Sequence, residues 1–176
     1  MKNDESGIIA RAVAGDSTAF RNVLDAHYMT IYRMAFRFCG NKPDAEDVTQ
    51  MTCMKLAQNI SAFKGESAFT TWLYTVVLNT ARDWKRSQSR HERGSIGLET
   101  IENTVSNSQT PEQILETSQK MVAVYNLPEP ECEIVWLVFG EGLSHKQVAE
   151  IMGVAEGTIS WRINEARKIL KEGGSK

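Results

Sequence analysis

The residue types that most often catalyse reactions or hold metals are few in this 176-residue chain and widely spaced. The three cysteines and three histidines form no C-x-x-C pair and show no metal-ligand spacing, so we expect no metal, no cofactor and no disulfide framework. The adjacent carboxylates Glu46 and Asp47 could mimic a catalytic pair, but no partner histidine, glycine-rich phosphate loop or activated nucleophile accompanies them. We therefore predict that the protein is not an enzyme.

Basic side chains gather in two short stretches of a chain whose formal net charge is −2. Residues 82–93 hold five Lys or Arg against two acidic residues, and residues 162–176 hold five against two. Local clusters of this kind can hold phosphate groups, and their distribution matters more than the net charge. A solvated helix face would give the same pattern, so charge alone leaves both explanations open.

Apolar residues recur at helical spacing almost throughout, which predicts an all-α fold with two small helical domains. Caps and breakers place helices at residues 5–14, 17–38, 43–59, 69–90, 111–125, 128–141, 144–152 and 156–171. Residues 91–110 are rich in Ser, Thr, Asn and Gly, and we interpret them as a flexible linker between domains at 1–90 and 111–176. The polar, acidic start and the lack of a long apolar run predict a cytoplasmic protein without membrane insertion.

Residues 148–154 and the helix after them have the pattern of a helix-turn-helix. Ala149 is small where two helices must approach closely, and Gly153 can adopt the left-handed turn conformation. In the second helix an apolar stripe is expected to pack inward: Ile159, Ile163, Ala166 and Leu170. The outward side chains could then enter the major groove of DNA: Ser160, Trp161, Asn164, Glu165 and Lys168. A plain helical hairpin packed on a partner has the same pattern.

Several segments together resemble the extracytoplasmic-function (ECF) sigma factors of bacterial RNA polymerase, in the sigma-70 family. They are Asp-Ala-Glu-Asp-Val-Thr-Gln at 44–50, the loop and helix start at 63–74, Leu-Pro-Glu at 127–129, Gly-Leu-Ser at 142–144, and Glu-Gly-Thr-Ile at 156–159. The resemblance implies a region 2 domain, a linker and a region 4 domain. It also implies a sigma factor that directs core RNA polymerase to specific promoters in a stress or envelope response, with an inhibitory anti-sigma partner.

By that resemblance, the helix at 43–59 docks on a coiled coil of the largest polymerase subunit. The residues implied in docking are Asp44, Glu46, Asp47, Gln50 and Met54. The spacing of Asp47, Gln50 and Met54 puts them on one side of the helix, away from the core positions Val48, Thr52 and Leu56.

The resemblance also implies that the loop at 64–70 and the helix after it bind the melted non-template strand of the downstream promoter element. The residues implied are Lys64, Ser67, Phe69, Thr70, Tyr74, Asn79, Arg82, Lys85 and Arg86. A flipped base needs a pocket and the strand needs cations along its backbone, which the loop and the arginines can supply. On this helix we expect Thr71, Thr75 and Leu78 to point away from the core.

For the duplex of the upstream element, the resemblance implies a set of residues in the last helix. They are Thr158, Ser160, Trp161, Arg162, Asn164, Glu165, Arg167 and Lys168. Arg162 and Arg167 flank the outward face and could hold phosphates. Three residues depart from the family pattern: Cys132 stands where Arg is usual, and Trp161 and Glu165 stand where small polar or basic residues are common.

Two further alternatives use the same helix-turn-helix. An ordinary regulator would bind duplex DNA without polymerase, but it has no use for the segments at 44–50 and 63–74. A sigma mimic that only titrates a regulator would be expected to lose basic positions, and Arg82, Lys85 and Arg86 are all present.

Overall fold

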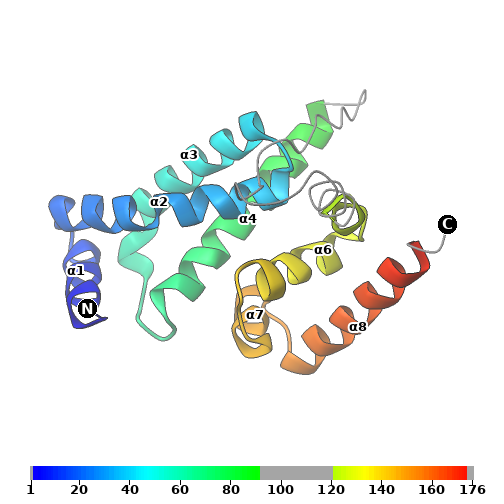
Figure 1. Ribbon diagram of the computed structural model, residues 1–176. Coiled ribbons are helices and arrows are strands. Elements are labelled where there is room, and N and C mark those ends of the chain that lie inside the picture. The colour runs from blue at the N-terminus through cyan, green and yellow to red at the C-terminus, as the bar shows by residue number, and fades with distance from the viewer. Residues whose placement is uncertain (1, 92–120, 174–176) are drawn as a thin grey trace, which may run out of the picture. The chain divides into compact units, whose positions relative to one another are not determined.

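The computed structural model describes residues 2–91 and 121–173, and the regular structure in these ranges is helical (Figure 1). The chain divides into two compact units, residues 1–98 and 99–176. The all-α prediction is confirmed. The predicted linker lies almost wholly outside the described residues, so its bounds stay a prediction, and of the predicted helix at 111–125 only residues 121–125 are described, as helix.

The N-terminal unit is built from α1 (Lys2–Val13), α2 (Ser17–Cys39), α3 (Lys42–Asn59), a 3₁₀ turn (Ile60–Ala62) and α4 (Phe69–His91). Asp16 caps α2, because its carboxylate accepts hydrogen bonds from the backbone N–H groups of Thr18 and Ala19. Gly40 ends α2 with φ 77°, a left-handed conformation that glycine adopts without a steric penalty. Both signals are short-range, which explains why the predicted bounds are correct to within a few residues.

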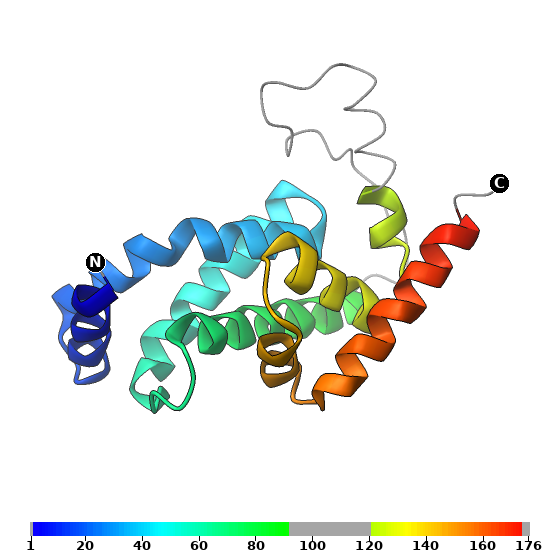
Figure 2. The same ribbon diagram turned by 60° about the horizontal axis from the view of Figure 1, so that its bottom comes forward.

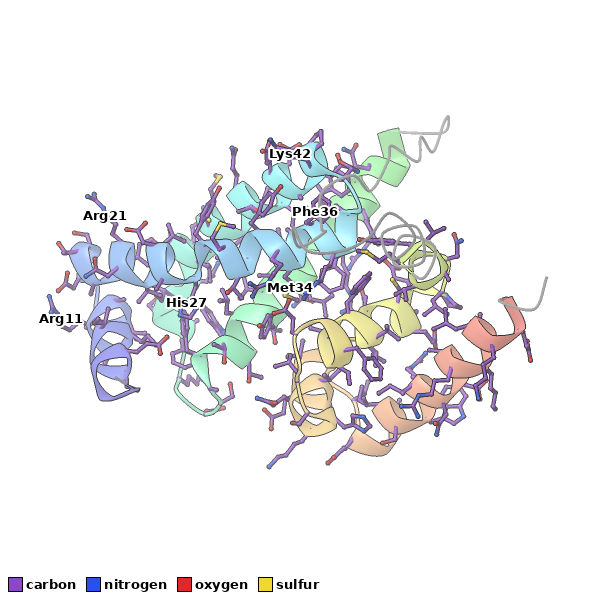
Figure 3. The ribbon with its side chains drawn as sticks, viewed as in Figure 1. Arg11, Arg21, His27, Met34, Phe36 and Lys42 are labelled. Atoms are coloured by element: carbon purple, nitrogen blue, oxygen red, sulfur yellow. The ribbon has the colours of Figure 1, made fainter. Side chains whose placement is uncertain are left out.

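The core of this unit forms where α2 packs against α3 and α4. Met34 points into it and is almost fully buried, whereas Arg21 points away from the helices (Figure 3). The expected core residues Val48, Thr52 and Leu56 of α3 are buried. The expectation for α4 was partly wrong: Thr71 and Leu78 are buried as well, because α4 is covered on more than one side.

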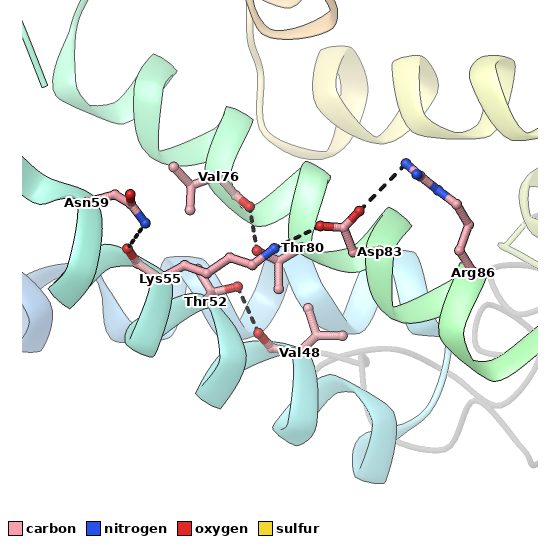
Figure 4. Close-up of polar contacts among 8 residues, drawn as sticks. All are labelled: Val48, Thr52, Lys55, Asn59, Val76, Thr80, Asp83 and Arg86. Carbon is pink, nitrogen blue, oxygen red and sulfur yellow. Dashed lines mark hydrogen bonds and ion pairs between the residues drawn. The ribbon is translucent and has the colours of Figure 1, made fainter. Parts of the chain in front are cut away.

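Two threonine hydroxyl groups buried in this core donate to carbonyl groups of their own helices. Thr52 Oγ1 donates to the carbonyl of Val48 at 2.7 Å, and Thr80 Oγ1 donates to that of Val76 at 2.7 Å (Figure 4). Lys55 Nζ then joins α3 to α4 by donating to Asp83 Oδ2 at 2.9 Å. These two hydroxyl groups are thus satisfied, and the Lys55–Asp83 contact fixes α3 against α4.

The C-terminal unit contains α6 (Glu129–Val135), a π-helical turn (Trp136–Gly140), α7 (His145–Met152) and α8 (Glu156–Gly173), and Figure 2 shows the short turn between α7 and α8. Ser144 and Gln147 form the predicted capping box at the start of α7. Gly153 ends α7 with φ 67°. The helix-turn-helix is thus confirmed, and α8 packs on α6 and α7 through Ile159 and Ile163.

Candidate nucleic-acid interface

The side of α3 away from the core carries a stripe of exposed side chains. Asp47 and Gln50 are exposed, and Met54 is 63% exposed. In the described residues neither Asp47 nor Gln50 is bonded to another side chain. A carboxylate, an amide and an apolar side chain in one line suit contact with another helix.

The other two predicted docking residues have local partners. Asp44 is half-buried at the start of α3, where its Oδ2 accepts from Asn41 Nδ2 at 2.6 Å and its N–H donates to Asn41 Oδ1 at 3.0 Å. Glu46 is exposed, with its Oε1 3.7 Å from Lys42 Nζ. Asp44 therefore stabilises the first turn of the helix, and the exposed stripe consists of Asp47, Gln50 and Met54.

An open groove of about 750 Å³ lies between α1 and the loop before α4. Four predicted residues of the downstream-element set line it: Lys64, Ser67, Phe69 and Thr70. The opposite wall comes from α1 and was not expected from the sequence; it consists of Glu5, Ser6, Ile9, Ala10 and Val13. Only the tertiary packing brings these two segments together, since about fifty residues separate them in the chain.

Aromatic rings support the loop from beneath. The Phe63 ring lies 5.3 Å from that of Phe69 and 5.5 Å from that of Trp72. His27 of α2 lies 5.2 Å from the Phe69 ring, and its Nε2 is 3.1 Å from Glu5 Oε1 of α1. Phe69 is 8% exposed, so it contributes an apolar floor to the groove rather than a projecting ring.

Tyr74 is buried, at 7% exposure. Burial raises the pKa of its hydroxyl, while the positive charges of Arg33 and Arg37 on α2 act to lower that pKa. These two arginines therefore lie near Tyr74, although the sequence reasoning did not single them out. Their i, i+4 spacing on α2 was the available signal.

Further along α4, Asn79, Lys85 and Arg86 are exposed and Arg82 is half-buried. Arg86 Nη2 lies 3.7 Å from Asp83 Oδ1 (Figure 4). Asp83 thus interacts with both Lys55 and Arg86, and the hydrogen bond from Lys55 lowers the pKa of its carboxyl group. Arg86 is thus a cation of α4 that lies beside this carboxylate.

The predicted outward face of α8 is present, but several of its side chains contact other side chains of the same unit. Trp161 is 57% exposed, and Asn164, Arg167 and Lys168 are exposed. Ser160 is half-buried, with its Oγ 3.0 Å from His145 Nδ1. Lys168 Nζ donates to Glu165 Oε1 at 2.6 Å, and that contact raises the pKa of Lys168. Thr158 is half-buried near the start of the helix.

Arg162 points back into its own unit instead of outward. Its Nη1 donates to Glu131 Oε1 of α6 at 2.6 Å, and the Glu131 side chain is only 9% exposed. The pair joins α8 to α6 across 31 residues of sequence. The expected phosphate contact of Arg162 must therefore compete with this ion pair, which positions α8.

The three cysteines are half-buried free thiols. Cys132 packs half-buried against the cluster of Leu127, Val135 and Ala166, so the departure from the family pattern at this site fills apolar space. Burial, with the nearby charge of Asp44, raises the pKa of the Cys39 thiol to about 12. A thiol with so high a pKa is a poor nucleophile.

Within residues 2–91 and 121–173, no three His, Cys, Asp or Glu side chains are grouped as metal ligands would be. None of the helices in these ranges is both long and apolar enough to span a bilayer.

Two family descriptions match the chain: Sigma-70 region 2 at residues 23–91, and Sigma-70 region 4 at residues 123–172. The chain is 29% identical over 183 residues to the ECF RNA polymerase sigma-E factor of Haemophilus influenzae, covering 95% of this chain and 93% of that protein. It is 28% identical to the ECF RNA polymerase sigma factor SigW of Bacillus subtilis, covering 93% of each.

Two solved structures are similar to this fold. CnrH, in complex with the cytosolic domain of CnrY, has a TM-score of 0.68 at 22% identity and covers 94% of this chain and 93% of its own. The sigma factor RpoE of Bartonella quintana, in complex with the anti-sigma factor NepR, also has a TM-score of 0.68, at 23% identity, over 87% of this chain and 94% of its own. At these identities the likeness concerns the fold.

Proposed function

Because the chain belongs to the sigma-70 family, in its extracytoplasmic-function group, we propose that its two units divide the recognition of polymerase and promoter between them. The protein directs core RNA polymerase to specific promoters and starts transcription, in a stress or envelope response. It acts in the cytoplasm as a specificity subunit without catalytic activity of its own. Each role falls to one of the surfaces described above.

The N-terminal unit docks on core polymerase through the stripe of Asp47, Gln50 and Met54 on α3. The observation that carries this assignment is the exposure of all three side chains in one line, with Met54 at 63%. An exposed methionine beside a carboxylate and an amide gains most by burial against a partner helix.

The same unit holds the melted non-template strand of the downstream element. A base extruded from the stack can enter the groove between α1 and the loop, where Lys64 and Thr70 offer polar groups above the Phe69 floor. Lys85 and Arg86 supply positive charge for the backbone of the strand.

The C-terminal unit places α8 in the major groove of the upstream element, as in other helix-turn-helix proteins. Arg167 and Lys168, both exposed, supply phosphate contacts. The net charge of −2 weakens DNA binding by the protein alone, since counterion release requires many cations near phosphate, so polymerase must supply the rest. An anti-sigma factor that covers these surfaces is the expected inhibitor.

The test is run-off transcription from a genomic promoter library, with purified core polymerase in the presence and absence of the protein. We expect discrete new start sites. Asp47→Arg or Gln50→Arg should reduce them roughly 30-fold or more, since a mispaired charge at an interface costs about 2 kcal/mol or more. Arg21→Glu, a charge reversal at an exposed position outside the proposed surfaces, is the matched control and should leave the transcripts unchanged.

An ordinary helix-turn-helix regulator is the competing function. It would produce no new start sites with core polymerase, while the protein alone would still retard duplex DNA in a gel. That pair of results would replace the sigma factor assignment.

A further inference from the structure

The outward face of α8 has fewer side chains available for reading bases than its sequence suggests. Ser160 Oγ lies 3.0 Å from His145 Nδ1, and Arg162 donates to Glu131 at 2.6 Å. Glu165 accepts from Lys168 at 2.6 Å, which neutralises much of the carboxylate charge that would otherwise repel phosphate. In the middle of the helix, Trp161 and Asn164 are exposed, and the Arg162 guanidinium lies 5.7 Å from the centre of the Trp161 ring.

Trp161 is the large apolar group on this face, at 57% exposure. It borders an open hollow of about 500 Å³, whose other lining residues are Asn164, Glu165, Arg167, Lys168 and Lys171. The hollow therefore combines one apolar ring with three cationic side chains. The cationic side chains can bind the phosphates at the edges of a DNA groove. The indole ring would then be buried against an apolar group inside that groove.

Only one base presents an apolar group in the major groove, namely thymine with its C5-methyl. We infer that Trp161 contacts a thymine methyl of the upstream promoter element and so selects A·T base pairs at that position, an inference that rests on the proposed function. Arg162 supports this role, because Glu131 holds its guanidinium in place and that guanidinium lies over the Trp161 ring, which limits the directions in which the ring can point.

The contact can be tested by removing the methyl group alone. On a promoter identified by the run-off experiment, each thymine of the upstream element is replaced in turn by deoxyuridine, which keeps the base pairing. Initiation is measured with holoenzyme carrying the wild-type protein, Trp161→Ala or Trp161→Leu. Ile169→Ala, at an exposed apolar position of α8 outside the hollow and outside the predicted DNA-contacting set, is the matched control.

With the wild-type protein we expect one or two deoxyuridine positions to lower initiation about fourfold, the loss that corresponds to one buried methyl group. With Trp161→Ala the same positions should have no effect, whereas Trp161→Leu, which keeps an apolar side chain, should retain part of it. Ile169→Ala should keep the full methyl dependence.

Deoxyuridine effects that are equal in the wild-type protein and in Trp161→Ala, or absent from both, would overturn the inference while leaving the sigma factor function in place. A lack of protein-dependent initiation on the unmodified promoter would instead overturn the proposed function, and this inference with it.

Discussion

The helices α3 and α8 each present candidate binding side chains on one exposed face, but the two faces are constructed differently. On α3, Asp47, Gln50 and Met54 extend from a helix whose ties to its neighbours, such as the Lys55–Asp83 contact, lie elsewhere. On α8, the candidates Ser160, Arg162 and Lys168 are themselves bonded to residues of the same unit.

The difference follows from what each face is proposed to meet. Side chains that become ordered only on binding can make a helix-on-helix protein contact, because the binding free energy is distributed over many weak contacts. Reading base edges requires a helix held at a defined angle in the groove, so part of its polar surface is used to hold it. Substitutions of the binding residues on α3 should therefore leave the free energy of unfolding nearly unchanged. Substitutions of several candidates on α8 should lower it.

The largest expected effect is at Arg162. Arg162→Ala leaves the carboxylate of Glu131 buried without its partner, which should destabilise the C-terminal unit by about 1–3 kcal/mol. Asp47→Ala on α3 should change stability by less than about 0.5 kcal/mol. Urea unfolding of the whole chain, followed by circular dichroism, gives both values. The double variant Arg162→Met and Glu131→Met should recover most of the loss, since no charge is then left unpaired.

If Arg162→Ala changed the free energy of unfolding as little as Asp47→Ala, the exposed faces of α3 and α8 would not differ in how their side chains are held.

The second effect concerns the turn that sets α8 against α7. Gly153 has φ 67°, and a methyl group there would meet no atom within 4 Å, so Gly153→Ala should cost only the backbone penalty of about 1–2 kcal/mol. Gly7→Ala in α1 also meets no atom within 4 Å, but it lies inside a helix and should stabilise the protein by about 0.5–1 kcal/mol. Thermal unfolding of the two variants should shift in opposite directions; a shift in the same direction would contradict the turn geometry.

A smaller effect is expected at Ser160. Ser160→Ala removes the contact with His145, worth about 1 kcal/mol, and gains about 0.5 kcal/mol of helix propensity. Ser87→Ala, at an exposed position of α4, gains the propensity alone and is the matched control. Equal free energies of unfolding for the two variants would show that the Ser160–His145 contact contributes nothing.

The smallest effect is a pH dependence in the N-terminal unit. Lys55 lowers the pKa of Asp83 below its ordinary value of 3.8, so the unfolded chain binds more protons in that range than the folded one. The pair therefore contributes stability above about pH 4, and this contribution disappears as the pH falls through the lowered pKa. Since the Asp83 side chain is 51% exposed, we expect less than about 1 kcal/mol.

Lys55→Met should remove that part of the pH dependence. Unfolding curves of the wild-type protein and this variant, measured between pH 2 and pH 7, would diverge as the pH rises. Parallel curves would mean that the exposed pair is screened by solvent.

Much of this protein could be predicted from short-range signals in the sequence. Asp16, Gly40, the Ser144–Gln147 box and Gly153 set the ends of helices through hydrogen bonds and backbone conformations within a few residues, so the helix bounds were correct to within a few residues. The apolar stripe of α8 was correct for the same reason, since its spacing depends only on the helical repeat.

Tertiary packing determined which polar side chains remain available. The Arg162–Glu131 pair spans 31 residues and the His145–Ser160 contact spans 15, and no local pattern indicates either. The α1 wall of the groove and the burial of Tyr74 likewise depend on how α1, α2 and α4 pack. Helix ends are governed by neighbours along the chain, whereas the exposure and partners of a side chain depend on residues that only the fold brings close.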